Sequence, residues 1–274
     1  MQTITLSNAQ HQLDLTKLVI GHARCTELTP LHTYLDRYLD AGGNCIDTAR
    51  LYHAGHDERM VGAYMKTKRR DRLVLATKCG HYNRDLYPVH HRLSEADICS
   101  DVETSLRELG TDYIDVLFLH RDDIKRPVEE IMPVLHRFVT EGKVRVIGAS
   151  NWTAGRIQTA NRFSIENGLT PFSVSQIHHS LALTTAAQSG DVSHVIMDNI
   201  EYAWYQDEKF PVMAWAPAGR GFFSKRINGV VEPEAKRERY YGWLGENIRR
   251  VDRVRALAHT HSVPAGAEGT DGDD

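Results

Sequence analysis

The sequence lacks a long hydrophobic run, a recognisable leader and an excess of one charge. No stretch reaches the roughly 18 apolar residues that a membrane-spanning helix needs. The first residues, MQTITLSNAQHQLDL, contain neither a basic patch nor the apolar core of a signal peptide. The formal net charge of -3 over 274 residues argues against nucleic acid or an anionic membrane as the main partner. These absences predict a soluble, cytoplasmic protein.

Cysteine is also scarce, and its spacing excludes the common thiol-based sites. The four cysteines, Cys25, Cys45, Cys79 and Cys99, show no CxxC pattern. Cys45 and Cys79 fall in apolar runs, where a free thiol behaves as a small hydrophobic side chain. Reduced thiols in a cytosolic protein are therefore the simplest interpretation.

Histidine is plentiful, but its placement does not predict a metal site. The fifteen histidines include the adjacent pairs His90-His91 and His178-His179. Adjacent residues of a strand point to opposite faces, so neither pair is expected to chelate one ion. We predict no metal, and a zinc hydrolase is the weaker alternative.

What the sequence does contain is a regular alternation of short apolar runs and longer amphipathic ones. The predicted strands cover residues 16–23, 44–49, 72–80, 113–120, 144–150, 173–179 and 211–217. The predicted helices cover residues 29–43, 57–68, 94–110, 128–143, 153–168 and 198–209. Thr29 is the expected N-cap of the first helix and Gly42 or Gly43 its end. Ser94 with Asp97 resembles a capping box.

Regular repetition of strand and helix indicates either a doubly wound open sheet or a (β/α)8 TIM barrel. The barrel is favoured because the units follow one another without a domain break, and because the first strand–helix turn lacks the GxGxxG fingerprint. The run Gly219-Arg220-Gly221 is not that fingerprint and opens no clear helix. Residues 1–263 are predicted to form a single barrel domain. A small hairpin around Ser7-Asn8-Ala9 would cap its bottom.

Three further segments lie outside this repeat. Residues 80–93, which include Tyr82 and Tyr87, and residues 219–247 are expected to be long loops at the carboxyl end of the barrel, where such folds keep their active sites. Residues 264–274, PAGAEGTDGDD, have no apolar period and are predicted to be a disordered polar tail.

Four polar residues stand at or just beyond the ends of apolar runs: Asp47, Tyr52, Lys78 and His120. The carboxyl ends of parallel strands meet at one rim, so we expect these groups to gather there. A lysine ammonium favours phenolate, which makes a neighbouring tyrosine a stronger acid and a usable proton donor. A buried Asp47–Lys78 ion pair between adjacent strands is the simpler interpretation, but it leaves Tyr52 and His120 unexplained.

The same residues resemble the catalytic tetrad of the aldo-keto reductases. The segments DTARLY, VETSLRELGTDYIDVLFLH, EGKVRVIGASNW and AWAPAGRG resemble that family in order. The resemblance implies a (β/α)8 barrel that reduces an aldehyde or a ketone to an alcohol, with NADPH or NADH as the cofactor. It implies that Tyr52 is the general acid, Lys78 its activator, Asp47 the partner of Lys78 and His120 the group that orients the substrate.

The resemblance also implies where a nicotinamide would bind. Ser150, Asn151 and Gln176 match the positions that hydrogen-bond the carboxamide, and Trp215 falls where an aromatic ring stacks on the nicotinamide.

Further positions bear on the phosphates and on the reaction. Gly219, Arg220 and Gly221 fall in the loop that passes over the pyrophosphate, although Arg220 could equally be a solvated loop arginine. Family members that reduce a carbon–carbon double bond have glutamate in place of His120. The histidine therefore favours carbonyl reduction or alcohol oxidation.

Two features depart from the family. Ala216 stands where the family usually has serine, and residues 264–274 resemble neither the helix nor the eighth strand that would follow. The eighth unit is thus expected to be missing or replaced, which leaves the choice between NADPH and NADH open. The alternative is a catalytically weak or silent barrel that acts as a nucleotide-binding regulatory subunit or is a truncated relic. The expected partner is a small carbonyl compound, and the oligomeric state leaves no mark on the sequence.

Overall fold

The computed structural model describes residues 1–21, 27–82 and 91–261. Predictions that concern Cys25, Tyr87, His90 and the tail 264–274 lie outside the described residues. The chain divides into two compact units, the first made of Met1–Ser175 and Tyr205–Pro211 and the second of Gln176–Trp204 and Val212–Asp274. A single domain over residues 1–263 stays a prediction.

A parallel sheet forms the centre of the first unit. Its six strands are β3 (Ile20–Gly21), β4 (Cys45–Asp47), β5 (Val74–Cys79), β6 (Ile114–Leu119), β7 (Val144–Ser150) and β8 (Val174–Gln176), of which the last reaches the first residue of the second unit. Each strand pairs with the next along the chain, which is the order expected of a barrel. All residues of β5 and β6 are buried, because the sheet is covered on both faces.

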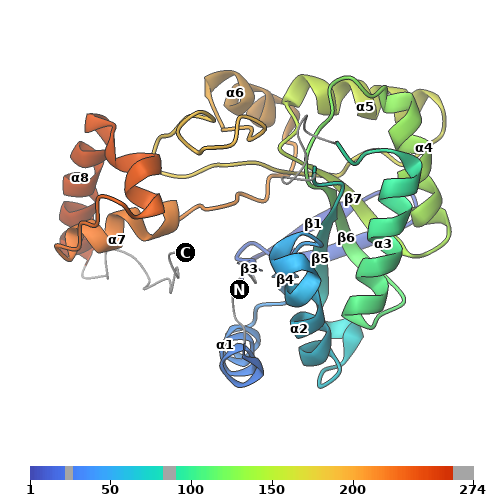
Figure 1. Cartoon of the computed structure of the whole chain (residues 1–274), viewed down its shortest axis with the longest axis horizontal. Helices are drawn as coiled ribbons and strands as arrows, with labels where there is room; N and C mark the ends of the chain where they lie inside the picture. Colours follow the sequence, from blue (N-terminus) through green and yellow to red (C-terminus); the bar gives the residue numbers. More distant parts are fainter. Residues whose placement is uncertain (22–26, 83–90, 262–274) are drawn as a thin grey trace. The chain divides into compact units, whose positions relative to one another are not determined.

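Helices cover the outer face of this sheet (Figure 1). They are α1 (Leu28–Asp40), α2 (His56–Met65), α3 (Glu95–Leu109), α4 (Val128–Thr140) and α5 (Ala154–Glu166), and α6 (Asn199–Glu208) follows β8. Under α1 and α2, apolar side chains such as Leu31, Leu35 and Val61 pack with Ile46 and Leu75 of the sheet. The periodicity of the sequence therefore predicted the order of these elements.

The helix ends that the sequence predicted are confirmed, with one exception. The Ser94 hydroxyl accepts a hydrogen bond from the Asp97 N–H at 3.1 Å, as the predicted capping box requires. The predicted end of α1 is confirmed by Gly42, whose φ is +86°. The N-cap of α1 is Glu27 and not Thr29. Pro30 fits the first turn, where its missing N–H is not needed, so the helix begins earlier than predicted.

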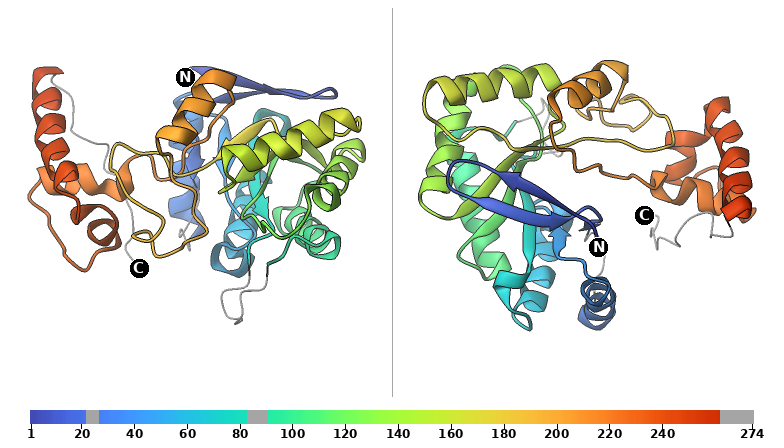
Figure 2. Two further views of the ribbon diagram at one scale, coloured as in Figure 1. Left: turned by 90° about the horizontal axis from the view of Figure 1, so that it is seen from above. Right: turned by 180° about the vertical axis from the view of Figure 1, so that it is seen from behind.

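The predicted hairpin is confirmed. Strands β1 (Thr3–Ser7) and β2 (Gln12–Thr16) pair antiparallel. The Asn8 amide donates to the Arg145 carbonyl at 2.7 Å, and the Ser173 hydroxyl donates to the Ser7 carbonyl at 2.9 Å. These partners lie where β7 and β8 begin, so the hairpin lies across the amino ends of the parallel strands (Figure 2). Of the predicted strand over residues 16–23, Ile20–Gly21 form β3, and residues 22 and 23 lie outside the described ranges.

The regular elements of the second unit are mainly helices. Helices α7 (Phe222–Ile227) and α8 (Gly245–His261), with a π-helical turn at Glu238–Gly242, surround an apolar cluster. Its buried members are Ala182, Phe222, Phe223, Tyr240, Tyr241 and Val251. The expectation of a long loop over residues 219–247 is therefore wrong. These aromatic residues supply the apolar surface that makes helix packing favourable.

The predicted strand over residues 211–217 does not form a continuous ladder, although the segment pairs with the one that contains β8. The Ser175 N–H donates to the Pro211 carbonyl at 2.9 Å, and the Trp215 N–H donates to the Ile177 carbonyl at 3.1 Å. Within the described chain, Trp215 makes only an isolated bridge, to His178. Ala216 has a φ of 51°, and Pro217 after it lacks the N–H that a ladder would use. None of the helices in the described ranges is both long and apolar enough to cross a bilayer.

Candidate active site

Lys78 is the centre of a polar cluster at the carboxyl ends of β4 and β5. Its ammonium donates to Asp47 Oδ2 at 2.8 Å and to the Thr48 carbonyl at 2.7 Å. The Lys78 side chain is only 2% exposed and that of Asp47 is 16% exposed. Burial by itself would lower the pKa of Lys78, but Asp47 and Tyr52 outweigh it, so the pKa lies above the ordinary 10.5. Lys78 is therefore an ammonium at neutral pH.

The register of the sheet explains why these two side chains meet. Asp47 pairs with Ala76, and Lys78 stands two residues further along β5 on the same face. The backbone pairing continues past the end of β4, since the Arg50 N–H donates to the Lys78 carbonyl at 3.1 Å. The segment that leads to Tyr52 is thus attached to the strand that carries Lys78.

Tyr52 and His120 complete the predicted group of four. The Lys78 ammonium lies 5.0 Å from the centroid of the Tyr52 ring. The rings of Tyr52 and His120 meet edge to face with centroids 5.8 Å apart. The His120 N–H donates to the Cys79 carbonyl at 2.7 Å, which holds the histidine beside the end of β5. The structure therefore brings all four residues together within the first unit.

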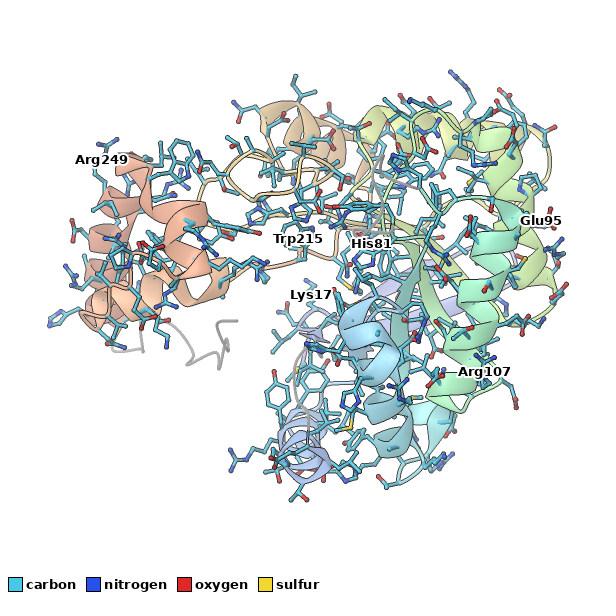
Figure 3. All side chains as sticks on the ribbon, viewed as in Figure 1. Lys17, His81, Glu95, Arg107, Trp215 and Arg249 are labelled. Atoms are coloured by element: carbon cyan, nitrogen blue, oxygen red, sulfur yellow. The ribbon has the colours of Figure 1, made fainter. Side chains whose placement is uncertain are left out.

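A second histidine, His81, adjoins this group and was not predicted. Its ring meets that of His120 edge to face at 4.7 Å between centroids, and both side chains are nearly buried. His81 (labelled in Figure 3) follows Gly80 directly beyond β5. That position at a strand end is the signal that could have identified it.

Ser150 and Asn151 stand at the end of β7, close to His120. Both are buried, and the Asn151 amide donates to Ser150 Oγ at 3.0 Å and to the His120 carbonyl at 3.4 Å. Asn151 has a φ of 57°, a left-handed conformation that asparagine tolerates better than most residues. A hydroxyl and an amide are thus buried together at the same rim as the group of four.

The other predicted cofactor residues belong to the second unit. Gln176 is buried, with its amide nitrogen 3.2 Å from the sulfur of Met213. The half-buried Trp215 meets the ring of His178 edge to face at 4.6 Å between centroids. Burial, assisted by the positive charge of Arg220, lowers the pKa of His178 to about 4. His178 is therefore neutral at pH 7.

The two adjacent histidines of this unit behave as predicted for neighbours on an extended segment. His178 is buried, with its Nε2 2.9 Å from the Tyr241 hydroxyl, and His179 is exposed. Across the described chain, no group of three or more side chains is placed to hold a metal ion.

Residues Gly219–Gly221 form a left-handed turn in which all three residues have positive φ. Gly221 is the N-cap of α7, so the expectation that this run opens no helix is wrong. The guanidinium of Arg220 lies 5.1 Å from the centroid of the Tyr240 ring. Arg220 therefore packs on an aromatic ring and is not a freely solvated loop residue.

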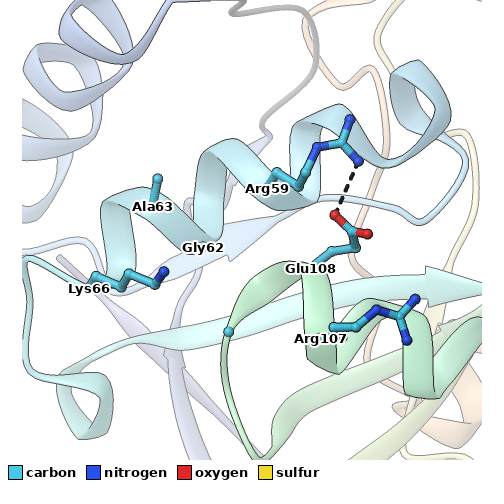
Figure 4. Close-up of a pocket in the computed structure, with 7 residues that line it drawn as sticks. Arg59, Gly62, Ala63, Lys66, Arg107 and Glu108 are labelled. Carbon is cyan, nitrogen blue, oxygen red and sulfur yellow. Dashed lines mark hydrogen bonds and ion pairs between the residues drawn. The ribbon is translucent and has the colours of Figure 1, made fainter.

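A cavity of about 360 Å³ between α2 and α3 does not coincide with this cluster (Figure 4). Its lining residues are Arg59, Gly62, Ala63, Lys66, Arg107, Glu108 and Gly110. Both helices end there, and the basic side chains of Lys66 and Arg107 complement the partial negative charge of helix carboxyl termini. We attribute this cavity to helix packing and place the candidate active site at the four gathered residues.

Comparison with known proteins identifies the family of the chain. The model of the Aldo/keto reductase family matches residues 20–267. The chain belongs to this family. The predicted resemblance is thereby confirmed, and so is the fold class, because aldo/keto reductases are (β/α)8 barrels and the six consecutive parallel strands follow that order.

The aldo/keto reductase has relatives with oxidoreductase names. Norsolorinic acid reductase from Aspergillus flavus is 36% identical over 251 residues, which cover 88% of this chain and 60% of that protein. Aryl-alcohol dehydrogenase from Pestalotiopsis microspora is 31% identical over 249 residues, 89% of this chain and 61% of that protein. A probable aryl-alcohol dehydrogenase from Saccharomyces cerevisiae is 40% identical over 152 residues, 52% of this chain and 45% of that protein. The chain thus spans less than two thirds of the length of these relatives.

Proposed function

We propose that this aldo/keto reductase is an NAD(P)H-dependent oxidoreductase that reduces an aldehyde or a ketone to the alcohol. The observation that supports the proposal is the buried Lys78–Asp47 pair beside the Tyr52 ring, with the His120 ring edge-on to it. Buried, paired ammonium groups are found preferentially at functional sites. Beside the Tyr52 phenol, the Lys78 ammonium provides a positive charge at the place where the hydroxyl proton must leave.

In the proposed reaction, Tyr52 donates its proton to the carbonyl oxygen of the substrate. The Lys78 ammonium, kept charged by Asp47, stabilises the phenolate that remains. His120 orients the oxygen by a hydrogen bond. When bound, the nicotinamide cofactor, NADPH or NADH, supplies the hydride that the carbonyl carbon needs.

Part of the cofactor contact is proposed for the first unit. Ser150 and Asn151 would bind the carboxamide, and a buried hydroxyl beside a buried amide fits a group that is both donor and acceptor. The roles of Gln176, Trp215 and Gly219–Gly221, in the second unit, rest on the family resemblance. The names of the relatives make aryl aldehydes and aryl alcohols the first substrates to test.

The test is the variant Tyr52→Phe, which removes one oxygen atom. We expect kcat for an aryl aldehyde to fall by about 100-fold or more, the size typical of a lost general acid. Tyr113→Phe is the matched control, since Tyr113 lies between the Arg70 and Arg145 guanidinium groups, 4.0 and 4.1 Å from its ring centroid. It stands before β6, at the other end of that strand from His120. Retention of most activity by Tyr52→Phe would show that the assignment is wrong.

A titration with NADPH and with NADH, followed by nucleotide fluorescence, separates this proposal from a silent nucleotide-binding barrel. Binding with turnover of a carbonyl substrate supports the reductase. Binding without turnover across a panel of aldehydes and ketones contradicts it and favours the regulatory alternative. Absence of binding contradicts both.

A further inference from the structure

The backbone directly after Tyr52 adopts a conformation that has to be held in place. His53, Ala54 and Gly55 have φ values of 44°, 51° and 85°, so three successive residues are left-handed. His53 and Ala54 carry a Cβ atom, and for such residues this conformation is unfavourable. Since the turn begins at Tyr52, the interactions that maintain it also determine where the phenol lies.

Arg50 is the main side chain that holds this turn. Its Nη1 donates to Glu58 Oε2 at 2.5 Å, and its Nη2 donates to the Ala54 carbonyl at 3.2 Å. The guanidinium lies so close to Gly55 that a Cβ atom on that residue would overlap it. The planar, forked guanidinium thus contacts both sides of the turn at once, which a lysine ammonium cannot reproduce.

We call the Arg50–Glu58 pair, with its contact to the Ala54 carbonyl, the clamp. Its Glu58 end is attached to the strand that carries Lys78. The Glu58 side chain is fully buried, and its second oxygen accepts a hydrogen bond from the Thr77 hydroxyl at 2.8 Å. Thr77 precedes Lys78 on β5, and the Arg50 N–H donates to the Lys78 carbonyl at 3.1 Å. Side-chain and backbone contacts therefore connect the turn to the same short stretch of strand.

A second carboxylate, that of Asp57, contacts His53 of the turn. His53 Nδ1 lies 2.8 Å from Asp57 Oδ1, and the Asp57 side chain is fully buried. Asp57 and Glu58 both belong to the first turn of α2, where the helix dipole stabilises negative charge. The beginning of α2 is thus a rigid anchor for the residues that follow Tyr52.

We propose that Arg50 is a positioning residue: through Glu58 and the turn at Gly55, it holds Tyr52 at a fixed place relative to Lys78. The inference rests on the proposed role of Tyr52 as the proton donor. Loss of the clamp displaces the phenol without removing any group that binds cofactor. Its effect therefore falls on kcat and not on the KM for the nucleotide.

The test compares Arg50→Met and Gly55→Ala with the matched control Gly142→Ala. Gly142 has a φ of +75°, close to that of Gly55, but nothing lies within 4 Å of a Cβ added to it. We expect Arg50→Met and Gly55→Ala to lower kcat by at least about tenfold, as displacements near 1 Å do in active sites. The KM for NADPH should stay unchanged, and Arg50→Lys should recover only part of the rate. Gly142→Ala should keep the kcat of the wild type.

A double variant decides whether Arg50 acts through Tyr52. In a Tyr52→Phe background, Arg50→Met should have no further effect on the residual rate, because the displaced group is already absent. An equal fold loss in both backgrounds, or a wild-type kcat in Arg50→Met, would overturn the proposal. Amide exchange of residues 52–55 should be faster in Arg50→Met. If Tyr52→Phe is active and exchange is still faster, the proposed function fails while the clamp is supported.

Discussion

Replacement of Asp47 by asparagine tests how much the buried ion pair contributes to the fold. The variant keeps the shape of the side chain but removes the charge that lies 2.8 Å from the Lys78 ammonium. At an effective dielectric constant of 20, two charges at that distance attract by about 6 kcal/mol before desolvation. Loss of one partner of a buried pair costs about 3–5 kcal/mol. Because the Thr48 carbonyl still accepts from Lys78, we expect the lower end, about 3 kcal/mol.

The measurement is urea unfolding at pH 7, followed by tryptophan fluorescence and circular dichroism. The midpoint should decrease with an unchanged slope, which identifies a change in stability rather than in the unfolded state. Glu103→Gln is the control, since it removes the same charge from a pair with Lys143 in which the side chains are 52% and 35% exposed. An exposed pair contributes at most about 1 kcal/mol. Equal effects of the two substitutions would refute the argument from burial.

The pH dependence provides a second check on the same pair. The folded-state pKa of Lys78 is raised above 10.5, so its stabilising contribution is fully present below pH 10.5 and is lost as the pH rises through the higher folded value. Lys78 should therefore add no pH dependence to the unfolding free energy of the wild type between about pH 6 and pH 9. Asp47→Asn removes the carboxylate that outweighs burial, so the pKa of Lys78 falls in that variant. A titration of Lys78 within that range in the wild type would show that it is not held as an ammonium.

Two further predictions concern the packing and the titration of other sites. A Cβ atom at Gly62 would lie 2.7 Å from the Leu109 carbonyl oxygen, so Gly62→Ala should destabilise the protein by about 1–3 kcal/mol in urea unfolding. Gly155→Ala, in α5 with nothing within 4 Å, should be neutral or stabilising; similar losses in both would contradict the packing argument. His178 is neutral in the fold, with a pKa of about 4 against an ordinary 6.5, so the unfolded chain binds the extra proton between these values. The unfolding free energy should thus fall by about 3 kcal/mol from pH 6.5 to pH 4, and an equally steep decline in His178→Gln would exclude His178 as the cause.

The fold shows which sequence patterns are sufficient by themselves. Alternation of apolar and amphipathic runs predicted the strands β4 to β7 and the helices between them, since burial on both faces of a parallel sheet requires it. Local capping predicted the start of α3 at Ser94. The same patterns predicted too much at residues 211–217, where only isolated bridging forms and the positive φ of Ala216 ends the extended segment.

For the candidate site, too, one part could be predicted from the sequence and another part could not. The positions of Asp47, Tyr52, Lys78 and His120 at strand ends can be read along the chain, because parallel strands place their carboxyl ends at one rim. Those four residues, and the chemistry they suggest, were determined by the sequence.

What only the tertiary structure decided is how these groups are held. Arg50 donates to Glu58 across a left-handed turn, and Glu58 accepts from Thr77 of β5. No spacing in the sequence therefore signals the clamp. His178 and Tyr241 are 63 residues apart in the chain and yet form a buried contact. Such pairs depend on distances that arise after the elements pack, because burial in three dimensions, and not order along the chain, determines which polar groups must find a partner.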